Sequence, residues 1–241
     1  MPNRLPSPVS TPTLPGLNTS IDDPSRPRAA AERAQSWGEE VANSLSHGIG
    51  CLLAVASLPI LVHFSAQRGG AVGVVGASVF SATMILLYLV STLYHALPAG
   101  CIKRWFNRLD HAAIYLFIAG SYMPYLLGVL RGPWGWTLFC IVWGTAALGA
   151  LAKLFDRPRR PLWSTGLYLA LGWVALLAAV PLFERLPAAE LGWLLAGGLA
   201  YSAGAVVFHF DGRLRYGHFV WHLFVLAGTG CHFVAVLLQV L

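Results

Sequence analysis

The stretch VGVVGASVFSATMILLYLV, residues 72–90, has nineteen residues and no charged side chain. As an α-helix it would extend about 28 Å, close to the ~30 Å hydrocarbon core of a bilayer. Backbone amides cannot stay unpaired in hydrocarbon, so a segment that crosses it must be helical. Each helix of a soluble protein would instead carry a polar stripe. The stretch therefore predicts a transmembrane helix.

Similar apolar segments recur in a chain that is 56% hydrophobic and 11% charged, with a mean hydropathy of +0.63. We predict an all-α integral membrane protein, a seven-transmembrane helix bundle formed by residues 41–241. The predicted spans are residues 45–64, 71–96, 111–130, 134–153, 162–183, 189–210 and 217–240. Residues 1–40 are rich in Pro, Ser and Thr and are expected to be a disordered cytoplasmic tail.

The distribution of Lys and Arg predicts the orientation. Of the 16 basic residues, all but Arg68, Arg131 and Arg185 lie in the N-terminal tail or in the three loops on the same side of the membrane. By the positive-inside rule the N-terminus is cytoplasmic and the C-terminus lies outside. The net charge of +6 then reflects topology and attraction to anionic lipid. Because the basic residues are divided among short loops, we expect no nucleic-acid partner.

Polar residues gather at the predicted cytoplasmic ends of four spans. They are Asn43, Ser46, His47, Ser91, His95, Asp110, His218 and His222. His218 and His222 are four residues apart, so their rings project from one helix face about 6 Å apart, which suits two ligands of one zinc ion. Ser91 and His95 repeat this spacing. The span count alone places all these residues on one side, and three imidazoles plus a water form the usual shell of a catalytic zinc ion.

Each of these residues also has a simpler interpretation. Histidines at a membrane interface can be ordinary anchors. Asp110 directly precedes an apolar run, so it is either a functional carboxylate or the cap of a helix that begins at His111. Asn43, Ser46 and His47 either lie beside the metal or form a network that fixes the entry of the first span.

Five ordered motifs resemble those of the haemolysin-III-related and progestin/adipoQ-receptor family, and are most similar to its bacterial haemolysin-III-type branch. They are EVANSLSHG (40–48), STLYH (91–95), RLD (108–110), GSYMPY (120–125) and HFVWH (218–222). The resemblance covers residues 38–241. It implies a multi-pass protein of the plasma (bacterial inner) membrane with Zn²⁺ held by His95, His218 and His222. It also implies that Asp110 orients a water molecule and that Ser91 is its partner.

Three functions are consistent with these expectations. The first is an intramembrane zinc-dependent hydrolase of lipid amides or esters, similar to the related alkaline ceramidases and acting in membrane lipid homeostasis. Asp110 would be its general base, and Ser91 would steady the water or oxyanion. The second is a non-enzymatic, receptor-like sensor of membrane state with a structural zinc. In both, a membrane lipid is the expected substrate or ligand. The third, a pore-forming cytolysin, is disfavoured because the spans contain no charged stripe to line a pore.

Overall fold

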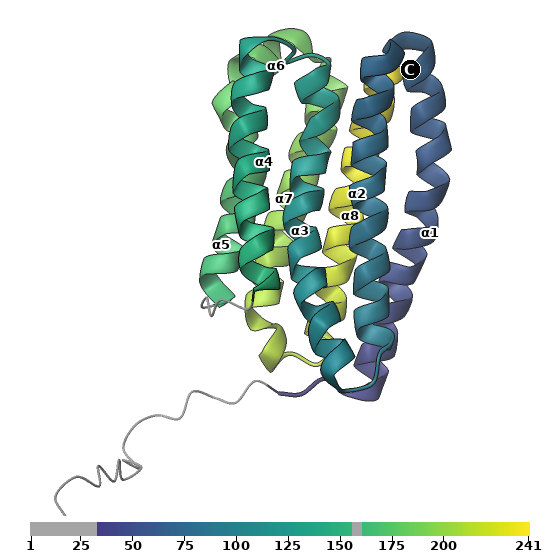
Figure 1. Ribbon diagram of the computed structural model, residues 1–241, viewed down its shortest axis with the longest axis vertical. Coiled ribbons are helices and arrows are strands. Elements are labelled where there is room, and N and C mark those ends of the chain that lie inside the picture. The colour runs from purple at the N-terminus through teal and green to yellow at the C-terminus, as the bar shows by residue number, and fades with distance from the viewer. Residues whose placement is uncertain (1–32, 156–160) are drawn as a thin grey trace, which may run out of the picture. The chain divides into compact units, whose positions relative to one another are not determined.

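A computed structural model describes residues 33–155 and 161–241 of the 241-residue chain (Figure 1). Every regular element in these two ranges is helical. The elements are α1 (Trp37–Arg68), α2 (Gly70–Ala96), α3 (Cys101–Leu127), α4 (Pro133–Leu154), α5 (Pro161–Gly172), the 3-10 helix η1 (Trp173–Ala178), α6 (Ala179–Arg185), α7 (Ala188–Phe210), the 3-10 helix η2 (Asp211–Arg213) and α8 (Gly217–Val240). The tail predicted for residues 1–40 lies outside the described residues as far as residue 32, and α1 begins at Trp37.

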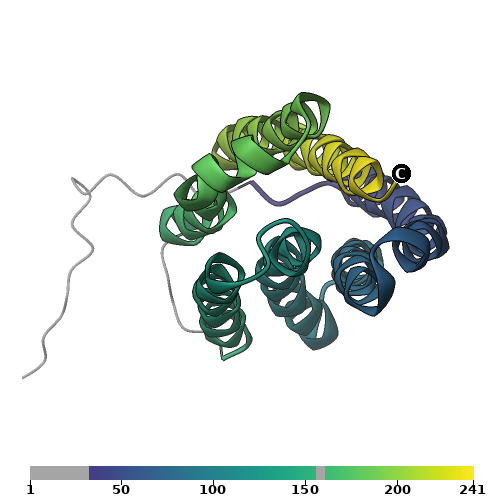
Figure 2. The same cartoon turned by 90° about the horizontal axis from the view of Figure 1, so that it is seen from above.

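The helices of residues 33–155 and 161–241 form a ring in chain order, as the view along their axes shows (Figure 2). Neighbours in the sequence pack against one another, and α8 closes the ring by contacting α1. The first turns of α1, α3 and α8 and the last turn of α2 therefore lie at the same end of the bundle (Figure 1). This arrangement brings the four polar segments together.

Six helical segments among the described residues are long and apolar enough to cross a membrane. They are Trp37–Arg68, Gly70–Ala96, Pro133–Leu154, Trp163–Arg185, Ala188–Arg213 and Gly217–Val240. Each coincides with a predicted span. The remaining one, residues 111–130, corresponds to α3, which is less apolar because it begins with a basic stretch and contains Tyr122, Pro124 and Tyr125 in its second half.

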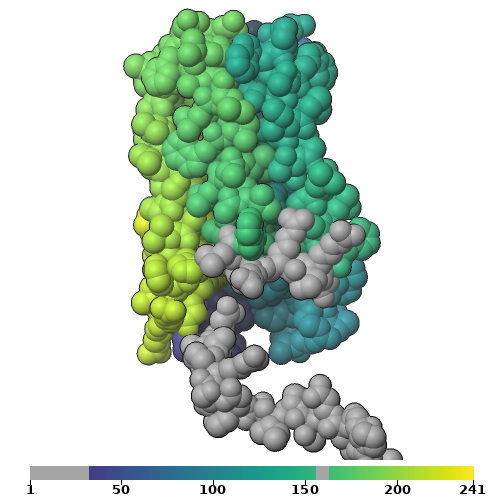
Figure 3. All heavy atoms as spheres, turned by 90° about the vertical axis from the view of Figure 1, so that its left-hand side faces the viewer, coloured from purple at the N-terminus to yellow at the C-terminus, as the bar shows by residue number. Residues whose placement is uncertain are grey.

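The surface of this bundle is apolar, and polar groups lie inside it. Leu52, Leu148 and Phe183 are each more than 70% exposed, whereas Asn43 and Ser81 are fully buried. Apolar exposure of this extent suits contact with lipid rather than water. Figure 3 shows the face to which α4, α5 and α7 contribute. The composition and the distribution of residues agree on an integral membrane protein.

The predicted fifth span, residues 162–183, is not one continuous α-helix. It is interrupted by η1, where 3-10 geometry leaves some α-helical backbone bonds unmade. The Tyr122 hydroxyl of α3 compensates: it donates to the carbonyls of Leu171 (2.9 Å) and Gly172 (2.6 Å) and accepts from the Ala175 amide (3.1 Å). A side chain distant in sequence thus stabilises the break.

A close helix approach places α1 against both α2 and α8. A Cβ atom on Gly50 would lie 2.7 Å from Leu226 Cδ2 and 2.9 Å from Tyr88 Cδ1. Small residues at such contacts allow membrane helices to approach closely. Gly50 lies about one turn after His47, so this contact also fixes the distance of His47 from α8.

Candidate metal centre

Three imidazoles converge at the end of the bundle where α8 begins. His95 lies in the last turn of α2, and His218 and His222 face the same side at the start of α8. Each offers one ring nitrogen, and these three atoms lie within 4.8 Å of one another. His95 and His222 are buried, and His218 is partly buried. The predicted histidines therefore meet in space with a geometry that could hold a metal ion.

The other ring nitrogen of each histidine is engaged by the protein. His95 Nδ1 lies 2.7 Å from Glu40 Oε2, and His218 Nδ1 lies 2.8 Å from Asp211 Oδ2. Ionised carboxylates only accept hydrogen bonds, so these Nδ1 atoms carry the proton and Nε2 keeps its lone pair. His95 Nε2 is buried without a hydrogen-bond partner among the described residues. A donor set of three imidazoles with an orphaned, inward nitrogen fits Zn²⁺.

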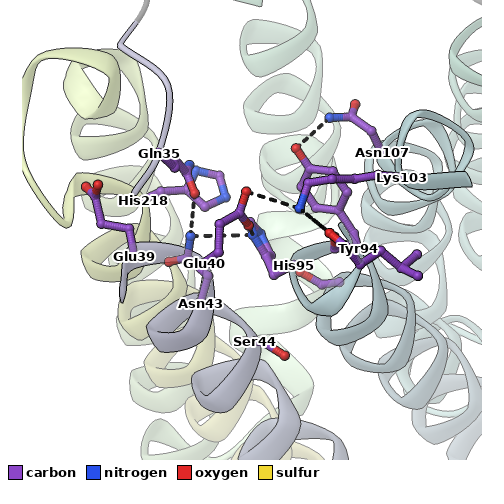
Figure 4. Close-up of polar contacts among 12 residues, drawn as sticks. Gln35, Glu39, Glu40, Asn43, Ser44, Tyr94, His95, Lys103, Asn107 and His218 are labelled. Carbon is purple, nitrogen blue, oxygen red and sulfur yellow. Dashed lines mark hydrogen bonds and ion pairs between the residues drawn. The ribbon is translucent and has the colours of Figure 1, made fainter. Parts of the chain in front are cut away.

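Asn43 and Ser46, predicted to lie beside the site, contact the third imidazole. His222 Nδ1 lies 3.1 Å from Ser46 Oγ and 3.2 Å from the Asn43 carbonyl oxygen. The Ser46 hydroxyl in turn donates to that carbonyl at 2.9 Å. The Asn43 side chain lies near His95, with Nδ2 3.5 Å from Nδ1 (Figure 4). Residues of the first motif therefore contact His95 and His222.

His47, Ser91 and Asp110 form a second polar chain next to the three imidazoles. Ser91 Oγ lies 2.7 Å from His47 Nδ1 and also hydrogen-bonds the Asp110 carboxylate. The His47 ring stacks on His222 with 3.5 Å between centroids and 7° between planes. Asp110 is only 8% exposed. A carboxylate, a hydroxyl and an imidazole are thus linked beside the candidate metal position.

The position of Asp110 excludes one of its two predicted roles. The third span was predicted at residues 111–130, but α3 begins at Cys101, nine residues before Asp110. Asp110 therefore lies inside the helix and is not the cap of a helix that begins at His111. The prediction missed this part of the helix because the polar segment before Asp110 lies outside the apolar run. Hydropathy alone predicts no span there.

A cavity of about 700 Å³ extends from the polar cluster into the bundle. Its polar end is lined by His47, Ser91, Asp110, His218 and His222. The rest is lined mostly by apolar and aromatic side chains of α3, η1, α6 and α7. A polar cluster at one end of an apolar cavity suits a molecule with a polar group and a hydrocarbon tail.

The start of α8 is tied to the first turn of α1. Glu39 Oε1 accepts from the Tyr216 amide at 2.7 Å, and Tyr216 has a left-handed backbone (φ 58°). Arg33 Nη1 donates to Glu39 Oε2 at 2.8 Å, and this hydrogen bond raises the pKa of the Arg33 guanidinium. These contacts hold the turn that leads into His218.

Sequence reasoning assigned no role to Glu40 or Asp211. Both are the acceptors for candidate metal ligands described above. Two signals were available in the sequence. One carboxylate lies in the first motif, and a second carboxylate lies seven residues before His218. Their partners could be assigned only when α1, α2 and η2 were placed in space.

Comparisons with known proteins agree with the motifs. Residues 35–233 match the family described as "Haemolysin-III related". The chain belongs to the haemolysin-III-related family. "Hemolysin-3" of Bacillus cereus is 44% identical over 203 residues, covering 84% of this chain and 92% of the relative. "Hemolysin-3 homolog" of Bacillus subtilis is 42% identical, covering 83% and 93%.

More distant relatives of this family member occur in animals. "Monocyte to macrophage differentiation factor" of Homo sapiens is 28% identical, covering 66% of this chain and 68% of the relative. "Adiponectin receptor protein" of Drosophila melanogaster is 24% identical, covering 80% and 49%. The resemblance to the progestin/adipoQ-receptor family is therefore confirmed. The prediction of a multi-pass membrane protein is confirmed as well.

Proposed function

We propose that this family member is an intramembrane zinc-dependent hydrolase of lipid amides or esters that acts in membrane lipid homeostasis. The observation that carries the proposal is that two of the three clustered imidazoles, His218 and His222, line a largely apolar cavity of about 700 Å³. His95, His218 and His222 would hold Zn²⁺, and the cavity would hold the hydrocarbon part of the lipid.

The ion would act as a Lewis acid that polarises the scissile carbonyl and acidifies a water molecule. Asp110 would accept a proton from the attacking water molecule while the water oxygen forms a bond to the carbonyl carbon. It would return that proton to the leaving nitrogen or oxygen when the amide or ester bond breaks. Ser91 supports this role because it hydrogen-bonds the Asp110 carboxylate and holds it beside His47.

The proposal includes seven membrane spans, with α3 as the third and the N-terminus in the cytoplasm of a bacterial cell. Two arguments support this topology: α3 packs between α2 and α4, and basic residues concentrate in the tail and in alternate loops. The site would then lie near the cytoplasmic leaflet of the plasma membrane, where a lipid carbonyl is located at the headgroup level.

The first test is the metal content of detergent-purified protein by mass spectrometry. About one zinc per chain is expected in the wild type, and loss of zinc in His95→Ala and in the double variant His218→Ala, His222→Ala. His63→Ala is the matched control, because His63 lies in the second half of α1 and contacts Gln67 instead. Zinc-loaded wild type is then incubated with ceramides, N-acyl lipids and phospholipid esters. A panel left wholly intact would refute the hydrolase.

A second candidate, a receptor-like sensor of membrane state with a structural zinc, is favoured by the similarity to the Drosophila "Adiponectin receptor protein". Asp110→Asn distinguishes the two. The measurement is membrane lipid homeostasis in cells that carry this variant. Impaired homeostasis with zinc retained supports hydrolysis, whereas normal homeostasis supports the sensor. The name "Hemolysin-3" belongs to the Bacillus relatives. We propose no pore for this chain, because the spans carry no charged stripe that could line one.

A further inference from the structure

The three imidazoles are not held in the same way. Two of them, His95 and His218, have a carboxylate on Nδ1, whereas His222 has only a hydroxyl and a backbone carbonyl. We propose that Glu40 and Asp211 are positioning residues that fix His95 and His218 with Nε2 toward the metal and increase the affinity for Zn²⁺. This inference rests on the metal site of the proposed function.

Both oxygens of Glu40 are engaged, which prevents the carboxylate from turning away. Oε2 lies 2.7 Å from His95 Nδ1, and Oε1 lies 3.1 Å from Lys103 Nζ. Figure 4 shows Glu40 between the His95 ring and the Lys103 ammonium group. Lys103 is itself held by the carbonyls of Tyr94 (3.0 Å) and Leu97 (3.1 Å) at the end of α2. Glu40 therefore links α1 to the helix that carries His95 and to the start of α3.

Asp211 performs the corresponding task for α8. Its Oδ2 accepts from His218 Nδ1 at 2.8 Å. Its backbone carbonyl accepts from the Leu214 amide at 3.1 Å, which closes the short turn of η2 before α8. The carboxylate is consequently placed by the local backbone structure of η2, in the same turn that the contact of Glu39 with the Tyr216 amide holds. The two carboxylates therefore hold two ligands from two different elements, α1 and η2.

The chemical consequence is twofold. An imidazole without a partner can rotate or carry its proton on Nε2, which would remove the lone pair from the metal. A carboxylate on Nδ1 excludes that tautomer and makes Nε2 a stronger donor. The negative charges also offset part of the charge of a divalent cation in a region of low dielectric constant. His222 has no carboxylate partner, so the carboxylate contribution to the zinc affinity comes from Glu40 and Asp211.

The test measures the zinc dissociation constant by competition with a chromophoric chelator, at fixed pH and in one detergent. Glu40→Ala and Asp211→Asn are each expected to weaken zinc binding by about 10- to 100-fold. Glu40→Gln retains an acceptor for His95 Nδ1 but lacks the charge, so its affinity should lie between those of Glu40→Ala and the wild type. Because Gln is nearly isosteric with Glu, this variant remains informative if Glu40→Ala does not fold.

Glu190→Gln is the matched control. Glu190 is a buried carboxylate in the first turn of α7, and no described hydrogen bond joins it to a histidine. This variant should bind zinc like the wild type. Thermal unfolding of the zinc-free variants separates a positioning role from a merely structural one, since a structural role would lower stability without changing zinc affinity.

The possible failures are distinguishable. Wild type that binds no zinc would overturn the proposed function. Wild type that binds zinc, with unchanged affinity in both Glu40→Ala and Asp211→Asn, would overturn only the inference about positioning.

Discussion

Replacement of Gly50 by alanine is expected to destabilise the protein, whereas the same replacement two residues earlier is not. The new Cβ would lie 2.7 Å from Leu226 Cδ2 and 2.9 Å from Tyr88 Cδ1, compared with about 3.5–4.0 Å for an ordinary carbon contact. Leu226 can rotate away. Tyr88 is 1% exposed and its hydroxyl donates to Thr229 at 2.8 Å, so its ring has no space into which it can move.

The magnitude follows from two opposing effects. Overpacking of a well-packed site costs about 1–3 kcal/mol. Replacing glycine by alanine inside a helix contributes about 0.5–1 kcal/mol of stability. At Gly48 the nearest atom to a new Cβ is Thr92 Cγ2 at 3.6 Å, so only the favourable effect applies. The helix effect cancels between the two variants, and Gly50→Ala should be about 1–3 kcal/mol less stable than Gly48→Ala.

The assay is thermal unfolding of both variants and the wild type in one detergent. For a chain of this size, 1 kcal/mol corresponds to about 2–4 °C, so the two midpoints should differ by about 2–12 °C. Gly50→Ala should also bind zinc more weakly. Displacement of α1 moves His47 away from His222, and the candidate ligand His222 then loses the ring that stacks on it. Equal midpoints, or a more stable Gly50→Ala, would refute the close packing of α1 against α2 and α8.

Three further predictions concern the site and the cavity wall. Asp110→Asn should retain zinc by mass spectrometry and lose lipid hydrolysis in the same preparation, and activity equal to the wild type would exclude Asp110 as the base. Tyr122→Phe should lower the thermal midpoint, because it removes the hydroxyl that hydrogen-bonds the Leu171 and Gly172 carbonyls and the Ala175 amide. Each group left unsatisfied lowers the free energy of unfolding by about 1–3 kcal/mol. Zinc at about 100 times its dissociation constant should stabilise the apoprotein by about 2.7 kcal/mol, and an unchanged midpoint would contradict a site that requires the folded state.

The sequence alone predicted the class of protein, the approximate positions of the long helices and the shared end of the bundle at which the polar residues lie. These predictions succeed because each depends on local properties. An uncharged segment long enough for the hydrocarbon core must be helical, and two histidines four residues apart must share a helix face. The ordered motifs also predicted the family correctly.

Only the tertiary structure decided how the polar residues are combined. Glu40 lies 55 residues from His95 in sequence, and Ser46 lies 176 residues from His222, so no local pattern joins them. Tyr122 likewise compensates for a helix break about 50 residues away. Such contacts depend on the order of helices around the ring and on close approaches such as that at Gly50. Hydrophobic length and periodicity determine where each helix lies along the chain, but not which face it presents to which neighbour, and that choice brings the histidines and their carboxylates together.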